Sequence, residues 1–144
     1  MLLIARADTP GYCQSVTGST DALDAPLVET ARREVFEETG IRVVDVAPDA
    51  ALPPGEVALA NLRDWQLSNI YEIYPVWRHR YAPGVTKNVE HVFGLLVPRH
   101  IPITLAPREH INAMWLPYRA AADHCFSPSN AEAILQLPNY AGRG

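Results

Sequence analysis

Apolar and polar residues recur along this chain in patterns that predict short strands and one clear helix. Apolar residues dominate 2–6 and, after a turn rich in proline and glycine, 12–16, which predicts two short strands near the start. From Pro26 onward the apolar residues recur every three or four positions until Gly40, where a glycine stop belongs. We therefore predict a helix that begins near Pro26, with Asp24 as its N-cap, and that ends at Gly40.

The predicted helix has two unlike faces. Its apolar face, expected to pack on the core, consists of Leu27, Val28, Ala31 and Val35. Its acidic face consists of Glu34, Glu37 and Glu38, which are three or four positions apart.

The rest of the chain predicts a mixture of strands, loops and one more short helix. Three prolines over 47–55 indicate a loop, and Pro83-Gly84 indicates a turn. The further elements predicted are strands over 67–77, 89–97 and 114–116 and a helix over 130–137 capped by Ser129 or Asn130. Without regular βαβ alternation, this order favours an α+β fold or an αβα sandwich.

Composition limits the classes of function. The chain has 144 residues, 48% of them hydrophobic and 19% charged, so we expect one folded domain. Its net charge of -4 argues against a nucleic-acid partner, and no apolar run is long enough for a membrane helix, so a cytoplasmic protein is the default. Cys13 and Cys125 form no CxxC pair and are expected to be free thiols.

The acidic face opposes two local rules of helix stability. Each like-charged pair costs about 0.2 to 0.5 kcal/mol, and acids in the last turn oppose the helix dipole by roughly 0.3 to 1 kcal/mol each. Two explanations stay open at this point. One is a solvated face with arginine partners, such as the i,i+4 pairs Glu29 with Arg33 and Arg33 with Glu37. The other is a divalent cation, because Mg²⁺ prefers carboxylate oxygens, waters and substrate phosphates.

The wider context of the acidic face adds a resemblance. Gly18 and Asp24 precede the string Arg33-Glu34-Val35-Phe36-Glu37-Glu38-Thr39-Gly40-Ile41. This pattern resembles the Nudix box, G-x5-E-x7-R-E-U-x-E-E-x-G-U, in which U is apolar. Asp24 stands where the box has glutamate, and eight rather than seven residues separate it from Arg33. The resemblance implies a single Nudix domain over 1–144, an α+β fold of the αβα sandwich type with a mixed sheet, either complete or lacking its first N-terminal strand.

Further strings resemble one branch of that family. Gln14-Ser15-Val16-Thr17-Gly18-Ser19, Arg78-His79-Arg80-Tyr81-Ala82-Pro83-Gly84-Val85-Thr86 and the later Glu90 look like the dihydroneopterin triphosphate pyrophosphatase branch, over roughly 2–137. Cys13 stands where the branch usually has tryptophan. The resemblance implies Mg²⁺-dependent cleavage of a pterin triphosphate to the monophosphate and pyrophosphate in folate biosynthesis. Two alternatives stay open: hydrolysis of dATP or another nucleoside triphosphate, and a binding module that has lost its chemistry.

The resemblance also implies residue roles. The implied metal ligands are Glu34, Glu38 and Glu109, and the implied catalytic residues are Glu34, Glu37 and Glu109, with either Glu34 or Glu109 as the general base. The residues implied for substrate binding are Arg6, Thr17, Tyr71, Glu72, Ile73, Tyr74 and Ser127. The implied cofactor is Mg²⁺, for which Mn²⁺ can substitute. The implied partner is a small-molecule pterin or nucleoside triphosphate, with neither nucleic acid nor membrane, and the oligomeric state is left open.

Overall fold

The computed structural model describes residues 1–6, 13–17, 26–72, 87–106 and 110–140. Within these residues, short strands and helices are mixed along the chain without βαβ alternation, so the predicted α+β class is confirmed. None of the helices in the described part of the chain has both the length and the apolar composition needed to cross a membrane.

The first strand, β1 (Leu2–Arg6), is the centre of a three-stranded antiparallel sheet. It pairs with β2 (Cys13–Gln14) on one edge and with β7 (His110–Trp115) on the other. The first predicted strand is therefore confirmed. β2 is shorter than the predicted 12–16, and β7 starts ahead of the predicted 114–116, because the ladder with β1 extends the pairing beyond the apolar residues.

The predicted long helix is confirmed as α1 (Leu27–Thr39), and Gly40 ends it. Gly40 has a φ of 76°, and its backbone N–H donates to the Phe36 carbonyl oxygen over 2.8 Å, which is the left-handed glycine stop of a helix. Pro26 occupies the N-cap position, with no side-chain cap hydrogen bond. Asp24, the predicted cap, lies outside the described residues.

The two faces of α1 are divided less sharply than the sequence predicts. The predicted apolar face is only partly buried along its length, at Leu27, Val28, Ala31 and Val35. The buried residues of α1 are Glu38 and Thr39, which are 4% and 1% exposed. The expected separation of core and acid is therefore wrong at Glu38, because the last turn of α1 lies against the start of β7.

Two short strands follow α1. β3 (Arg42–Val44) and β4 (Glu56–Ala58) pair in parallel, and the predicted loop over 47–55 connects them. The sequence did not predict these strands, because three residues are too few to establish an alternation. The residues around them form a core cluster whose buried members are Ile41, Val57 and Ile101.

The longest strands, β5 (Leu62–Glu72) and β6 (Lys87–Leu95), form an antiparallel pair. They correspond to the predicted strands over 67–77 and 89–97, and both begin earlier than predicted. The predicted residues after Glu72 and the predicted turn at Pro83-Gly84 lie outside the described residues.

A bulge explains why the start of β5 was missed. A single 3-10 turn, η1 (Leu59–Asn61), leads into the strand, and the register with β6 then shifts between Asp64 and Leu67. Gln66 lies inside this bulge with a φ of 54°. Two residues of β5, Trp65 and Gln66, have no partner on β6, and the left-handed backbone at Gln66 interrupts the extended strand, so only the part after the bulge was predicted as a strand.

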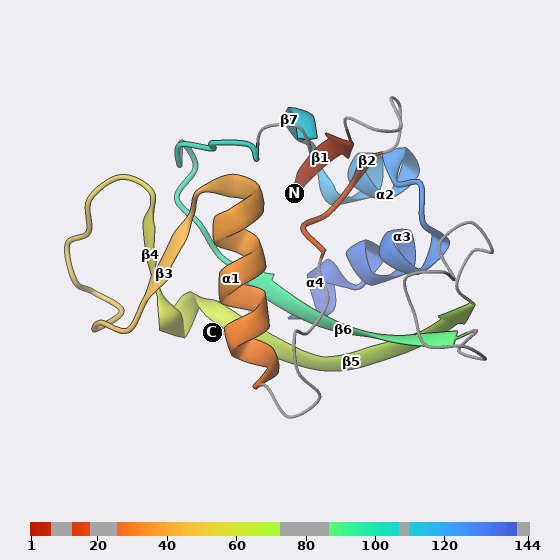
Figure 1. Ribbon diagram of the computed structural model, residues 1–144, viewed down its shortest axis with the longest axis horizontal. Helices are drawn as coiled ribbons and strands as arrows, with labels where there is room; N and C mark the ends of the chain where they lie inside the picture. The colour runs from red at the N-terminus through yellow and green to blue at the C-terminus, as the bar shows by residue number, and fades with distance from the viewer. Residues whose placement is uncertain (7–12, 18–25, 73–86, 107–109, 141–144) are drawn as a thin grey trace.

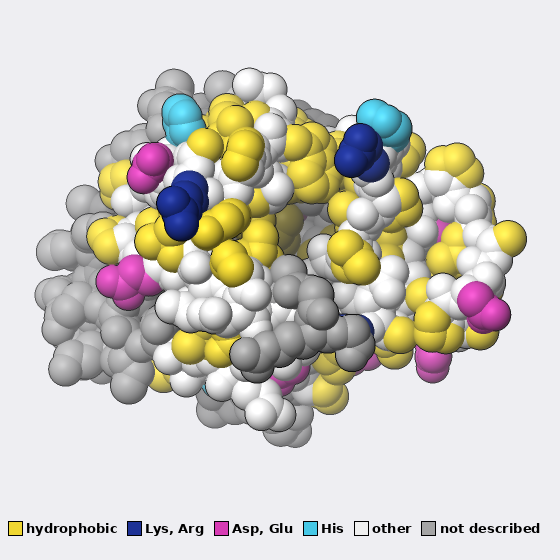
Figure 2. Space-filling view, turned by 180° about the vertical axis from the view of Figure 1, so that it is seen from behind, with side chains coloured by type: hydrophobic (Ala, Val, Ile, Leu, Met, Phe, Trp, Pro, Cys, Tyr) yellow, Lys and Arg dark blue, Asp and Glu magenta, His cyan; other side chains and the backbone are white. Residues whose placement is uncertain are grey.

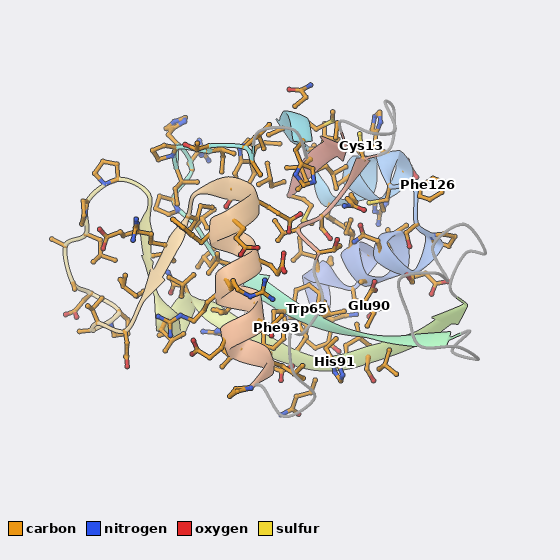
Figure 3. The ribbon with its side chains drawn as sticks, in the orientation of Figure 1. Cys13, Trp65, Glu90, His91, Phe93 and Phe126 are labelled. Carbon is orange, nitrogen blue, oxygen red and sulfur yellow. The ribbon has the colours of Figure 1, made fainter. Side chains whose placement is uncertain are left out.

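Two of the three C-terminal helices were not predicted. They are α2 (Tyr118–His124) and α4 (Leu137–Tyr140). The Tyr140 ring of α4 stacks on Trp65 of the bulge, with ring centroids 4.6 Å apart and planes 7° from parallel. Figure 3 shows Trp65 next to α4, close to the β5–β6 pair.

The predicted helix over 130–137 is α3 (Pro128–Leu135), shifted toward the N-terminus. Its N-cap is Ser127, whose Oγ accepts a hydrogen bond from the Asn130 backbone N–H over 3.4 Å. Neither Ser129 nor Asn130 is the cap, because proline at Pro128 fits the first helical position and moves the helix start forward.

A second core cluster joins the first sheet to α2 and α3. Its buried members are Leu3, Ala5, Cys13, Ala121, Ala122 and Ile134. Cys13 and Cys125 are free thiols, and the two residues meet in an isolated parallel bridge, where the Phe126 N–H donates to the Cys13 carbonyl oxygen over 3.0 Å (Figure 3). Asn130 fastens the same region, since its Oδ1 accepts from the Ser15 N–H over 3.0 Å and its Nδ2 donates to the Ser15 Oγ over 2.7 Å.

The elements thus surround the sheet of β1, β2 and β7. Figure 1 shows α1 on one side of β1 and β2, α2 and α3 on the other, and the β5–β6 pair running below them. On the face seen in Figure 2, the Lys and Arg side chains of the described residues are few and separated, with hydrophobic side chains between them. No basic patch therefore gathers on that part of the described surface.

Candidate active site

The three glutamates of the acidic face differ in exposure. The side chain of Glu37 is 51% exposed, that of Glu34 is 16% exposed and that of Glu38 is 5% exposed. Three- and four-residue spacings keep them on adjacent parts of α1, but the helix is rotated so that the face leads from solvent into the interior. The acids are therefore placed along an edge of the core, with Glu38 innermost.

Glu38 meets a histidine from another element. Its Oε1 lies 3.5 Å from Nε2 of His110, the first residue of β7, and the His110 side chain is 6% exposed. A carboxylate taken out of water is costly unless polar or charged groups compensate for its lost hydration. The last turn of α1 and the start of β7 thus bring two titratable side chains together in the interior.

Arg33 supplies compensation for the two outer acids. Its Nη1 lies 2.9 Å from Oε1 of Glu34 and 3.4 Å from Oε2 of Glu37. These ion pairs offset the like-charge repulsion between the glutamates, so the expected pairing of Arg33 with Glu37 is confirmed. Oε1 of Glu29 lies 3.1 Å from Nη1 of Arg32, three residues further along α1. Nη2 of Arg32 also donates to the Val43 carbonyl oxygen over 2.8 Å.

A set of short contacts fixes the end of α1. The Thr39 hydroxyl donates to the Val35 carbonyl oxygen over 2.6 Å and accepts from the Ile41 N–H over 3.3 Å. The Thr104 N–H donates to the Thr39 carbonyl oxygen over 2.8 Å, and a Cβ added at Gly40 would lie 3.1 Å from the Thr104 Cβ. The last turn, with its glutamate, is therefore held in place from both sides.

The third predicted metal ligand, Glu109, lies outside the described residues, although the residues that flank it are described. The His110 N–H donates to the Ala106 carbonyl oxygen over 3.2 Å. Among the residues that are described, no three His, Cys, Asp or Glu side chains gather into a group that could hold a metal ion. The assembly of Glu34, Glu38 and Glu109 into one site therefore stays a prediction.

The predicted substrate-binding residues of the strands are placed only by their backbone. Arg6 is the last residue of β1 and pairs with His110 of β7. The backbone of Arg6 therefore lies next to the residue that contacts Glu38. Tyr71 and Glu72 are the last residues of β5, and they pair with the first residues of β6. Ile73 and Tyr74 lie outside the described residues.

The two predicted hydroxyl contacts lie near β2 and α3. Thr17 is exposed, and its Oγ1 accepts from Nε2 of Gln14 over 3.5 Å. Ser127 has a local structural role as the cap of α3, and its Oγ lies 3.0 Å from the Ser129 Oγ. Glu90, part of the string that carried the resemblance, is half-buried on β6, and Figure 3 shows it on the side toward α4.

Sequence reasoning gave no role to His110, Thr39 or Thr104. His110 directly follows Glu109, so its proximity to an acid was visible in the sequence. Its contact with Glu38 was not, because that contact depends on how β7 packs against α1. Nothing in the sequence marked Thr104 as the partner of the helix end.

Comparison with known proteins defines the class to which this fold and acidic helix belong. The NUDIX domain matches residues 1–137, and the chain therefore belongs to the Nudix family and is a Nudix hydrolase. Nudix hydrolases generally use a divalent metal and act on small phosphorylated molecules.

Relatives within the family are more specific. The chain is 39% identical over 138 residues to the dihydroneopterin triphosphate diphosphatase of Escherichia coli strain K12, a match that covers 95% of this chain and 81% of the relative. The enzyme of the same name from Haemophilus influenzae is 32% identical over 134 residues, with 93% and 75% covered. The solved structure of the E. coli dihydroneopterin triphosphate pyrophosphohydrolase is similar with a TM-score of 0.77 and 37% identity, over 97% of this chain and 86% of that chain.

Proposed function

We propose that this chain hydrolyses dihydroneopterin triphosphate to dihydroneopterin monophosphate and pyrophosphate, a step of folate biosynthesis. The observation that carries the proposal is the similarity of the chain, over 95% of its length, to relatives named for this substrate. The Nudix acids that these enzymes require are present on α1. We also propose that it works in the cytoplasm, where thiols such as Cys13 and Cys125 stay reduced.

The donors present on α1 fit Mg²⁺, with Mn²⁺ as a substitute. Mg²⁺ is usually held by one or two carboxylates together with waters and substrate phosphates, so Glu34 and Glu38 would suffice with a bound triphosphate. Both side chains are largely withdrawn from water. A carboxylate attracts a cation more strongly in such a partly buried position than in bulk water. Glu109 is proposed as the third ligand. The bound ion would neutralise phosphate charge and lower the pKa of a coordinated water.

The chain's own residues then take separate roles. Either Glu34 or Glu109 accepts the proton of the attacking water, and Arg33 orients Glu34 from 2.9 Å away. Glu37, the most exposed of the three helix acids, is the proposed catalytic residue at the solvent edge of the site. Because Arg33 also contacts Glu37, one arginine controls the geometry of both outer acids.

The substrate itself is proposed to bind through the residues implied by the resemblance. Tyr71 and Tyr74 offer aromatic surfaces for the pterin, and the Glu72 carboxylate can accept hydrogen bonds from pterin N–H groups. The polar and apolar contacts that complete the set are Arg6, Thr17, Ile73 and Ser127. The proposed partner is thus a small-molecule pterin triphosphate rather than a nucleic acid or a membrane.

Parallel assays with dihydroneopterin triphosphate and dATP test the choice of substrate. We expect a higher kcat/KM for the pterin, with pyrophosphate as a product of both reactions. Hydrolysis in ¹⁸O-labelled water, with mass analysis of both products, identifies the bond that is cleaved. A higher kcat/KM for dATP would instead support the nucleotide alternative, and no pyrophosphate from any triphosphate in Mg²⁺ would support a binding module.

A variant pair tests the role of the acidic face. Glu38→Gln should lower turnover by orders of magnitude, because the amide replaces a charged ligand, while the fold is kept. Glu29→Gln is the matched control, since Glu29 belongs to the same helix but lies outside the acidic face. Full activity of Glu38→Gln would remove Glu38 from the proposed metal site.

A further inference from the structure

We propose that His110 is a positioning residue that holds Glu38 in its metal-binding orientation, by donating its Nε2–H to one carboxylate oxygen. The inference rests on the proposed role of Glu38 as a metal ligand. The Oε1–Nε2 distance is 3.5 Å, and the two side chains are 5% and 6% exposed. This separation is slightly longer than the usual N–H···O hydrogen-bond distance of about 2.7–3.2 Å, and the burial of both side chains leaves little water to compete for either atom.

Both partners are held by backbone hydrogen bonds to other segments of the chain. His110 pairs with Arg6 in the β1–β7 ladder, and its N–H is bound to the Ala106 carbonyl oxygen over 3.2 Å. Glu38 belongs to the last turn of α1, where the Thr39 carbonyl oxygen accepts from the Thr104 N–H over 2.8 Å. The imidazole and the carboxylate are therefore brought together by a sheet and a helix end.

The chemistry of the pair suits a ligand held from behind. A carboxylate has about four lone-pair sites, so one N–H bond leaves the others available for a cation. A neutral imidazole with its proton on Nε2 is sufficient as the donor, so the role needs no positive charge. Carboxylate ligands of metal sites are commonly oriented by such outer hydrogen bonds, and their loss typically weakens metal binding by about 10- to 100-fold.

Glu34 provides a comparison within the same site. Its partner, Arg33, is the preceding residue of α1, so the sequence of one helix supplies both members of that pair. Glu38 obtains its partner from β7 instead. We therefore assign to His110 the orienting role for Glu38 that Arg33 has for Glu34.

Two substitutions separate donation from mere bulk. In His110→Gln the side-chain amide nitrogen can reach the Nε2 position, whereas in His110→Asn it reaches only the Nδ1 position. Mn²⁺ binding is measured by the electron paramagnetic resonance signal of free Mn²⁺, on the full chain, with thermal unfolding to confirm folding. We expect His110→Asn to bind Mn²⁺ about 10- to 100-fold more weakly than the parent, and His110→Gln to stay within about threefold.

Each outcome has one meaning. If His110→Asn binds Mn²⁺ as the parent does while Glu38→Gln binds weakly, His110 has no positioning role and the proposed metal site stands. If His110→Gln is as weak as His110→Asn, donation from the Nε2 position is refuted. If Glu38→Gln itself binds like the parent, the proposed role of Glu38 as a metal ligand fails, and the inference about His110 fails with it.

A measurement on the unsubstituted chain covers the case in which a variant does not fold. The ¹⁵N shifts of the imidazole show which ring nitrogen carries the proton. We expect a proton on Nε2 of His110, both with and without Mg²⁺. A neutral ring protonated only on Nδ1 would overturn the inference, because Nε2 could then not donate to Glu38.

Discussion

Replacing Gly40 by alanine is expected to destabilise the protein and to disturb the end of α1 that carries Glu38. Gly40 has a φ of 76°, a left-handed conformation that costs little only for glycine. A Cβ at this position would also lie 3.1 Å from the Thr104 Cβ. Thr104 cannot withdraw freely, because its N–H is bound to the Thr39 carbonyl oxygen over 2.8 Å.

The magnitude has two parts. A residue with a Cβ in the left-handed conformation loses about 1–2 kcal/mol. Carbon atoms prefer separations of about 3.5–4.0 Å, and overpacking of this kind costs about 1–3 kcal/mol. Gly40→Ala should therefore reduce the free energy of unfolding by about 2–5 kcal/mol, which leaves a domain folded unless its stability lies near the lower end of the typical range of about 5–15 kcal/mol.

Two other glycines separate these parts in urea unfolding experiments. Gly55 has a φ of 91° with nothing within 4 Å of an added Cβ, so Gly55→Ala should show the conformational cost alone. Gly94 has no left-handed φ, but a Cβ there would lie 2.5 Å from Nε1 of Trp65, so Gly94→Ala should show the contact cost alone. If Gly40→Ala loses no more stability than Gly55→Ala, the contact with Thr104 is not a constraint and the reasoning is refuted.

Three further predictions concern residues outside the acidic face of α1. Asn130→Ala should lower the free energy of unfolding by about 1–3 kcal/mol, because it removes both hydrogen bonds from Asn130 to the half-buried Ser15, and an unchanged urea midpoint would contradict this. Burial, with a smaller contribution from the nearby Cys13 thiol, raises the pKa of Cys125 from its ordinary 9.0 to about 11, so stability present below pH 9 should be lost as the pH rises toward 11. Cys125→Ala should flatten that part of the stability profile, and a parallel profile would refute the assignment. Tyr140→Leu, which keeps apolar bulk, should cost about 0.5–1.5 kcal/mol by removing the ring stacked on Trp65, measured by urea unfolding, whereas no loss would show that the stack is neutral.

The sequence was most informative where local rules decide the structure. α1 was predicted with its glycine stop because thirteen residues of helical periodicity are followed by a residue that tolerates the left-handed conformation. The strand β1 was predicted because a short apolar run, ended by turn residues, is a local signal for a buried strand. The acids of α1 were predicted to be neighbours because helix geometry alone fixes their spacing.

The sequence was least informative where contacts between distant segments decide. β3 and β4 are three residues each, and their pairing across a long loop leaves no periodic signal. The bulge at Trp65 and Gln66 interrupted the extended strand, so the start of β5 was not predicted. A charged side chain such as Glu38 is expected at the surface. Its burial results from the packing of β7 against the end of α1, which the sequence does not reveal.

The two α1 acids that we propose as metal ligands, Glu34 and Glu38, show why a motif can be recognised in a sequence before its geometry can. Glu34 is oriented by Arg33, the preceding residue of the same helix. The formation of α1 is therefore enough to bring these two side chains together. Glu38 is oriented by β7 and by the contacts that lock the helix end at Gly40, so its environment exists only after the sheet and the helix have packed together. Chemical identity at this site is therefore a property of the local sequence, whereas the orientation of the inner carboxylate is a property of the complete fold. A mutation at His110 or Gly40 can consequently weaken the site without changing any of the proposed ligands.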